Sequence, residues 1–101
     1  MKGRSPTKEE QEWMDFICQY GCIVCRNEMS VFSPCEPHHI EGKTKAGAHF
    51  LTIPLCWGHH RSGYNTTECV SRHPYKAEFQ KRYGKEMDLL EQMRELSCNA
   101  D

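Results

Sequence analysis

Four of the six histidines in this chain occur as two adjacent pairs, His38-His39 and His59-His60. Imidazole is the commonest side-chain metal ligand, and its ordinary pKa of about 6.5 also suits it to accept a proton near neutral pH. His38 and His60 could bind one divalent cation, which would neutralise charge on a phosphate. His39 beside it could then take a proton from a water molecule. Phosphodiester hydrolysis requires this combination of groups.

Two alternatives use the same histidines without catalysis. Adjacent histidines can simply be exposed, or both can bind zinc, so His38, His39 and His60 could together serve a purely structural metal site. A zinc-stabilised module that only binds DNA or a recombination protein would likewise not need His39 as a base.

Cysteine spacing predicts a separate structural zinc site. Cys22-Ile-Val-Cys25 and Cys56-Trp-Gly-His59 each hold two ligands three positions apart, which lets both reach one tetrahedral zinc ion. We therefore predict that Cys22, Cys25, Cys56 and His59 bind zinc. Such a site would stabilise a domain that has little apolar core.

Other residues have similar spacings and remain alternatives. Cys35-Glu-Pro-His38 and Cys69-Val-Ser-Arg-His73 could replace the predicted zinc ligands, or Cys69 and His73 could serve a second site. A redox role for Cys22-x2-Cys25 would need a βαβ context, which the sequence does not indicate.

Length and composition limit the class of protein. A chain of 101 residues with 38% hydrophobic residues and a mean hydropathy of −0.77 is one small domain with a thin core. No apolar run is long enough to span a bilayer, and no signal-peptide core is evident, so we expect a cytoplasmic protein. Seven cysteines in that compartment favour metal ligands plus free thiols over disulfides.

Helices are predicted at both ends of the chain. Thr7-Lys8-Glu9-Glu10 has the spacing of a capping box and Gly21 suits a helix end, so a first helix lies between them. A helix is expected from His73-Pro74 to Gly84, and another over residues 85–96. We expect residues 1–6 to be a disordered leader, residues 7–97 to be a single domain and residues 98–101 to be a frayed tail.

A hairpin is predicted for the centre of the chain. Strands around His38-His39 and Phe50-Pro54 would flank a loop, and a helix starting near Trp57 would return His60 to the first strand. Residues 26–34 are predicted to form a loop with a short strand at 30–32, and residues 61–71 another loop. The fold class is α+β.

Positive charge is concentrated in the segment that carries the histidines. Residues 37–85 hold eight basic and three acidic residues, whereas the two ends together hold five basic and eleven acidic ones. A phosphate-binding surface requires such a distribution, although an ordinary solvated surface can also show it. The predicted contacts to the DNA backbone are Lys43, Lys45, Arg61, Arg72 and Lys76.

The combined motif resembles that of a known family. Pro-His-His-Ile, a spacer and Ile-Pro-Leu-Cys-x2-His-His resemble the HNH endonucleases, also called ββα-metal or His-Me finger enzymes. The sequence is most similar to the phage recombination-enhancement nucleases, the Ref-like, RecA-dependent group. The shared pattern includes Cys22-x2-Cys25, Ser71-Arg72-His73-Pro74, Phe79 and Tyr83-Gly84.

The resemblance implies roles for individual residues. It implies His39 as general base, His38 and His60 as ligands of a catalytic Mg²⁺, Mn²⁺ or Zn²⁺ ion, and the Cys22/Cys25/Cys56/His59 set as ligands of structural zinc. His73 would be a third ligand, a phosphate contact or a helix cap. The residue that orients the base, an asparagine in HNH enzymes, would be His49 or Thr52 here.

The resemblance also implies an activity. It implies a DNA endonuclease of phage recombination with little sequence specificity, leaving 5′-phosphate and 3′-hydroxyl ends, with a RecA filament as a partner.

Overall fold

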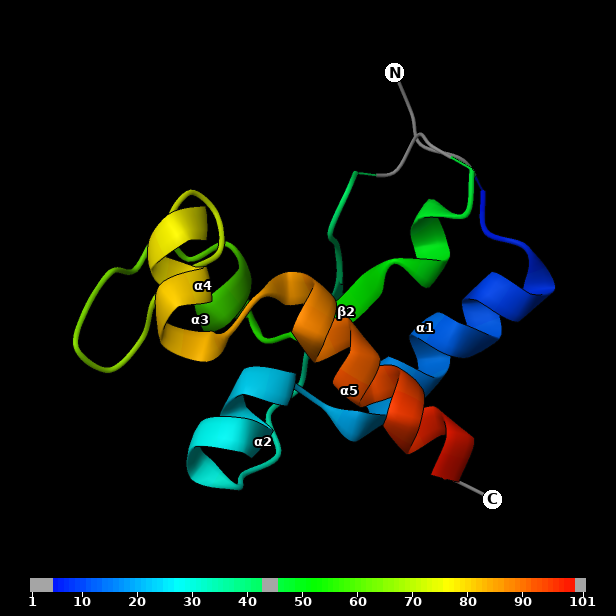
Figure 1. The fold of residues 1–101 in the computed structure, drawn as a ribbon, viewed down its shortest axis with the longest axis horizontal. Helices are drawn as coiled ribbons and strands as arrows, with labels where there is room; N and C mark the ends of the chain where they lie inside the picture. The colour runs from blue at the N-terminus through cyan, green and yellow to red at the C-terminus, as the bar shows by residue number, and fades with distance from the viewer. Residues whose placement is uncertain (1–4, 43–45, 100–101) are drawn as a thin grey trace.

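The computed structural model describes residues 5–42 and 46–99, with the side chain of residue 99 excepted. Five α-helices, one 3₁₀ helix and a two-stranded sheet make up the described part (Figure 1). Residues 1–4 of the expected leader, and Lys43 and Lys45, lie outside it. In chain order the elements are α1 (Lys8–Tyr20), α2 (Ile23–Met29), β1 (Glu36–His39), η1 (Ala48–Phe50), β2 (Thr52–Leu55), α3 (Trp57–His60), α4 (Lys76–Tyr83) and α5 (Glu86–Asn99).

Helix α1 begins and ends where local chemistry predicts. The hydroxyl of Thr7 accepts from the amide of Glu10 at 3.1 Å, and the Glu10 carboxylate accepts from the amide of Thr7 at 2.8 Å. This capping box is confirmed, and it satisfies amides that have no partner inside a helix. Gly21 ends the helix with a φ of 88°, which favours glycine. The chain changes direction there, before Cys22.

The predicted hairpin is confirmed. Strands β1 and β2 pair antiparallel, with His38 opposite Ile53 and His39 opposite Thr52. Helix α3 follows β2 after one residue, which gives the ββα order expected for this α+β fold. All four residues of β2 are buried, because α1, α2, α3 and α5 all contact this strand. Figure 1 shows α5 passing across it.

The loop after α3 folds back onto the end of that helix. The last carbonyls of a helix lack partners inside it. Here the carbonyls of His59 and His60 accept from the amides of Arg72 and His73, each at 2.9 Å. These two bonds place His73 beside His60 although thirteen positions separate them in the chain. The expectation that a helix starts at His73-Pro74 is wrong, since α4 begins at Lys76.

A single apolar cluster joins the sheet to the helices. Its fully buried members on helices and strands come from α1, α2, β2, α4 and α5, and include Ile17, Ile53, Phe79, Leu90 and Met93. Burial of such side chains stabilises a domain by roughly 1.5–3 kcal/mol each. The buried cysteines Cys22 and Cys25 lie in the same cluster, so the predicted zinc ligands form part of the core.

Three further expectations differ from the structure. Residues 26–29 of the expected loop belong instead to helix α2, because the Cys22 thiol accepts from the amide of Cys25 at 3.5 Å and caps a new helix, which Ser30 ends in a left-handed conformation. Residues 30–32 form no strand. Helix α5 extends to Asn99 and so includes the first two residues of the expected tail. None of the helices in the described residues is both long and apolar enough to cross a membrane.

Candidate functional site

Four side chains converge as the cysteine spacing predicts. We call Cys22, Cys25, Cys56 and His59 the tetrad; their ligand atoms all lie within 4.8 Å of one another. The Cys25 and Cys56 sulfurs are 3.9 Å apart, and Nδ1 of His59 lies 3.2–3.7 Å from the three sulfurs. A tetrahedral zinc ion with ordinary bond lengths separates its sulfurs by about 3.8 Å, and sulfur from nitrogen by about 3.6 Å. The tetrad could therefore hold zinc.

A hydrogen bond between two thiols of the tetrad moves their pKa values in opposite directions. The hydrogen bond between Cys22 and Cys56 lowers the pKa of the Cys56 thiol to about 3 and, together with burial, raises the pKa of Cys22 well above its ordinary value. Thiolates, not thiols, bind zinc. A cation that binds the tetrad would displace protons from the thiols that retain them.

The alternative zinc ligands lie elsewhere. The Cys35 sulfur is directed at the carbonyls of Ile17 and Cys18, at 4.0 and 3.9 Å. The Cys69 thiol donates to the carbonyl of Gly58 at 3.2 Å. Within the part of the chain that the structure describes, neither cysteine belongs to a group of convergent ligand atoms.

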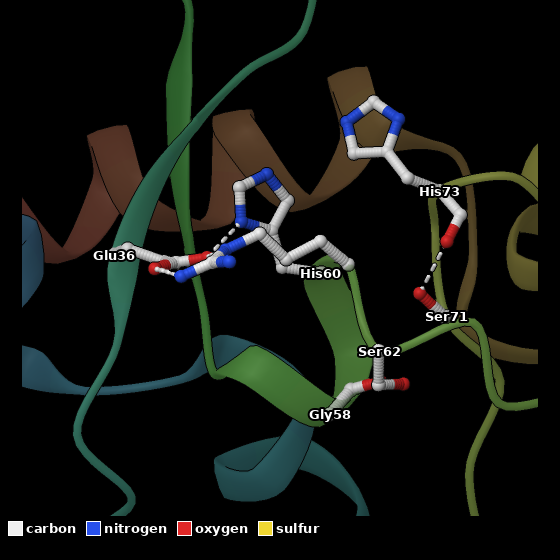
Figure 2. A network of polar contacts seen from close by, with 7 residues as sticks. Glu36, Gly58, His60, Ser62, Ser71 and His73 are labelled. Carbon is white, nitrogen blue, oxygen red and sulfur yellow. Dashed lines mark hydrogen bonds and ion pairs between the residues drawn. The ribbon is translucent and has the colours of Figure 1, made fainter.

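A second group consists only of imidazoles. We call His38, His60 and His73 the imidazole cluster; their ligand atoms also lie within 4.8 Å of one another. Ring centroids are 4.9 Å apart for His38 and His60, and 5.2 Å for each pair with His73. The three rings come from β1, α3 and the loop before α4. Figure 2 shows His60 on α3 and His73 on that loop, where the Ser71 hydroxyl donates to the His73 carbonyl at 2.7 Å.

His38 and His60 each have one ring nitrogen within hydrogen-bond distance of a carboxylate. Nδ1 of His60 lies 2.6 Å from the carboxylate of Glu36, which also binds Arg61 (Figure 2). Nε2 of His38 lies 2.5 Å from the carboxylate of Glu86. The remaining nitrogen of His38, Nδ1, is buried and has no hydrogen-bond partner among the described residues. A buried nitrogen without a partner fits a metal ligand, and three imidazoles suit zinc or nickel.

Burial keeps the imidazole cluster neutral. It lowers the pKa of His38, His60 and His73, and the hydrogen bonds that His38 and His60 donate to Glu86 and Glu36 oppose this only in part. A neutral imidazole has a lone pair for a cation, so these rings are ready to bind a metal ion at neutral pH.

His39 lies next to the cluster and contacts a different partner. Its Nε2 is 2.9 Å from Nδ1 of His49, which is buried on η1. The hydroxyl of Thr52 donates to the His49 carbonyl at 3.0 Å and accepts from Nε1 of Trp13 at 3.0 Å. His49 therefore contacts the ring of His39 directly, whereas Thr52 acts on it through His49.

The rings face a shared hollow. A cavity of about 370 Å³ is lined by residues from β1, the following loop, α3 and the loop before α4. Those residues are Pro37, His38, His39, Gly42, His60, Arg61 and His73. His39 and the imidazole cluster thus border the same space, as a hydrolytic site would require.

The predicted DNA contacts occupy different environments. Lys76 is exposed on α4, and the Arg61 side chain is 58% exposed while it binds Glu36. Arg72 does not fit the expectation, because its side chain is only 12% exposed and its Nε donates to Glu86 at 2.6 Å. The buried ion pair makes Arg72 part of the support for His38 rather than a surface for phosphate.

Sequence reasoning missed both carboxylates. Glu36 stands two positions before His38 on the same strand, and that proximity is a signal that could have indicated it. Glu86 lies 48 positions from His38, and nothing local distinguishes it from other acidic residues at the start of a helix.

The fold and the two ligand groups together define a small α+β domain with a ββα order and two places that could hold metal ions. A family model described as recombination enhancement, RecA-dependent nuclease matches residues 6–98. The match covers most of the chain, so this protein belongs to that family, as the sequence motifs predict. The family name indicates a nuclease of recombination.

Proposed function

We propose that the protein is a metal-dependent DNA endonuclease of the HNH type, with His39 as general base and His38, His60 and His73 as ligands of a divalent cation. The observation that carries the proposal is the meeting of three imidazoles, from three segments, beside His39 on one hollow. Membership in a nuclease family supports a hydrolytic role for this hollow rather than a purely structural one.

Each residue would have a distinct task. A divalent cation bound by the cluster would supply positive charge for the scissile phosphate and the leaving oxygen. His39 would accept the proton of the attacking water, because imidazole is the side chain best suited to general base catalysis near neutral pH. His49 would hold the ring of His39 in position through its 2.9 Å contact. Arg61 and Lys76 would bind the DNA backbone without reading sequence.

The tetrad would hold structural zinc. It links the first turn of α2 to α3, the helix that carries His60. Loss of that zinc would displace His60 and so act indirectly on the proposed site. The RecA filament is the proposed partner that delivers the DNA, since the family is named for RecA dependence.

A nicking assay tests the proposal. Supercoiled plasmid, single-stranded DNA and RecA-coated DNA would each be incubated with the zinc-loaded protein and Mg²⁺, Mn²⁺ or Zn²⁺. His39→Ala is expected to reduce the cleavage rate by roughly 10²–10⁴-fold, the usual contribution of a general base. Zinc content and the circular dichroism spectrum should stay unchanged.

His49→Ala serves as a graded comparison. It leaves the base in place but removes its neighbour, so we expect a smaller loss of rate than for His39→Ala. Equal cleavage by His39→Ala and the unmodified protein would remove the enzyme proposal and favour the non-catalytic DNA-binding module.

A further inference from the structure

We propose that Glu86 and Arg72 position His38 so that it binds the cation through Nδ1, whereas His60 binds the same cation through Nε2. This inference rests on the proposed function, because it assigns the ligand atoms of that site. It also gives the last helix, α5, a part in the metal site.

The contact between His38 and Glu86 is deeply buried. His38 is 1% exposed and Glu86 is 2% exposed, and the distance from Nε2 to the carboxylate oxygen is 2.5 Å. The same oxygen accepts from Nε of Arg72 at 2.6 Å. Buried charges persist when they are paired and hydrogen-bonded, so Arg72 keeps the Glu86 carboxylate ionised in this setting.

The ionised carboxylate fixes the tautomer of His38. A carboxylate can only accept hydrogen bonds, so Nε2 of His38 must carry the proton in the contact with Glu86. In a neutral imidazole the other nitrogen then has the lone pair. That nitrogen is Nδ1, the buried atom that has no hydrogen-bond partner among the described residues.

The same reasoning gives the opposite tautomer for His60. Glu36 accepts from Nδ1 of His60 at 2.6 Å, which leaves the lone pair on Nε2. Neither Glu36 nor Glu86 belongs to the group of convergent ligand atoms, within the residues that the structure describes. The carboxylates therefore lie behind the rings, and the opposite nitrogens are the ones available to a shared cation. Carboxylates that hold a ligating histidine in this way typically raise metal affinity.

Nuclear magnetic resonance of the histidine rings tests the assignment without any substitution. Protein labelled with ¹⁵N, with the tetrad already filled with zinc, would be titrated with further Zn²⁺. We expect the Nδ1 resonance of His38 and the Nε2 resonance of His60 to shift, while the other nitrogen of each ring keeps its proton. A shift at Nε2 of His38 would overturn the inference and leave the proposed nuclease intact.

A matched pair of variants tests the role of Glu86. Glu86→Gln is expected to weaken Zn²⁺ binding at the imidazole cluster by roughly 10–100-fold in calorimetry, as for other supporting carboxylates. Glu91→Gln removes an exposed carboxylate on the same helix that pairs only with Arg94 among the described residues, and should leave the affinity unchanged. Equal affinity of both variants would remove the role of Glu86.

The two proposals fail in different ways. If added Zn²⁺ shifts none of the three rings, the metal site is overturned and the ligand assignment falls with it. If the rings bind Zn²⁺ but Glu86→Gln has no effect, only the positioning role is lost.

Discussion

The tetrad and the imidazole cluster start from neighbouring residues of one short helix but differ in chemistry. His59 belongs to the tetrad and His60 to the cluster, because successive residues of a helix point in directions about 100° apart. The tetrad combines thiols with one imidazole and is mostly buried in the core. The cluster has only imidazoles and borders an open hollow.

The supports of the two groups differ as well. Backbone turns and the apolar core hold the tetrad, as in the bond from the Cys25 amide to the Cys22 sulfur. The cluster instead depends on carboxylates that bind the outer nitrogens of His38 and His60. A closed four-ligand set is typical of structural zinc, and a three-ligand set with an open side is typical of catalytic metal.

We expect the dependence between the two sites to run one way. The tetrad fixes the start of α3, so its loss should remove the cluster too. His38 and His73 of the cluster lie on β1 and on the loop before α4, which carry no residue of the tetrad, so loss of the cluster should leave the tetrad intact.

The largest effect is expected from the tetrad. Cys25→Ser should prevent folding, because structural zinc contributes about 10–16 kcal/mol in small zinc domains, comparable with the whole stability of an ordinary domain. Circular dichroism and zinc analysis would measure the loss.

Cys69→Ser is the matched control. The Cys69 thiol lies near the tetrad and donates to the Gly58 carbonyl, and a serine hydroxyl can do the same. This variant should keep its zinc and fold. If Cys25→Ser stays folded with the imidazole cluster able to bind metal, the one-way dependence is wrong.

A smaller effect is expected from the glycine that precedes the tetrad. A side chain on Gly21 would bring Cβ within 2.7 Å of the Phe32 ring and 2.9 Å of the Ser33 carbonyl oxygen, at a φ of 88°. Gly84 has a similar backbone, with a φ of 102°, but nothing within 4 Å among the described residues. Gly84→Ala should cost about 1–3 kcal/mol from backbone strain alone.

Gly21→Ala should cost that amount plus roughly 1–3 kcal/mol from the clash. Urea unfolding of both variants would measure the difference. Equal destabilisation would show that the turn into Cys22 tolerates a displaced Phe32, and that the tetrad does not depend on this turn.

The smallest effect concerns pH. Burial lowers the pKa of the three cluster imidazoles, so the unfolded chain binds more protons than the folded one below the ordinary imidazole pKa of about 6.5. The free energy of unfolding should therefore fall as the pH drops from 7 towards 5. Denaturant titrations with the tetrad filled and the cluster metal-free would follow it.

The contribution of Glu36 falls in a lower window. Hydrogen bonds from Arg61 and His60 lower its pKa to about 2, so its stabilisation is present above pH 4.5 and is lost progressively as the pH falls from 4.5 towards 2.

A variant tests the contribution of the imidazoles. His73→Gln should reduce the change in unfolding free energy between pH 7 and 5 while zinc content stays constant. A free energy that rises as the pH falls over that range would contradict the assignment of neutral rings.

Local patterns predicted most of the framework. The capping box at Thr7, the hairpin, the order of strands and helix, and the tetrad all follow from spacings of a few residues within each segment. Helix α2 was missed because a thiol, rather than a usual capping hydroxyl or carboxylate, starts it.

Long-range contacts could not be predicted in the same way. The bonds from Arg72 and His73 to the α3 carbonyls shift the start of α4 and bring His73 to the cluster. The ion pair of Arg72 with Glu86 depends on how α5 packs across the sheet. The charge pattern of the sequence predicts a DNA contact for Arg72. This differs from the structure because the sequence does not show which charged side chains become buried.

The central claim is that one chain holds two metal ions of different chemistry, one on each side of α3. A spectroscopic titration of metal-free protein with Co²⁺ tests it most directly, because thiolate ligands give a charge-transfer absorption that imidazoles lack. We expect two Co²⁺ ions to bind per chain, the first at the tetrad with thiolate absorption and the second at the imidazole cluster without it. His73→Ala should lose only the second ion. A single Co²⁺ per chain, or two with thiolate absorption, would contradict it.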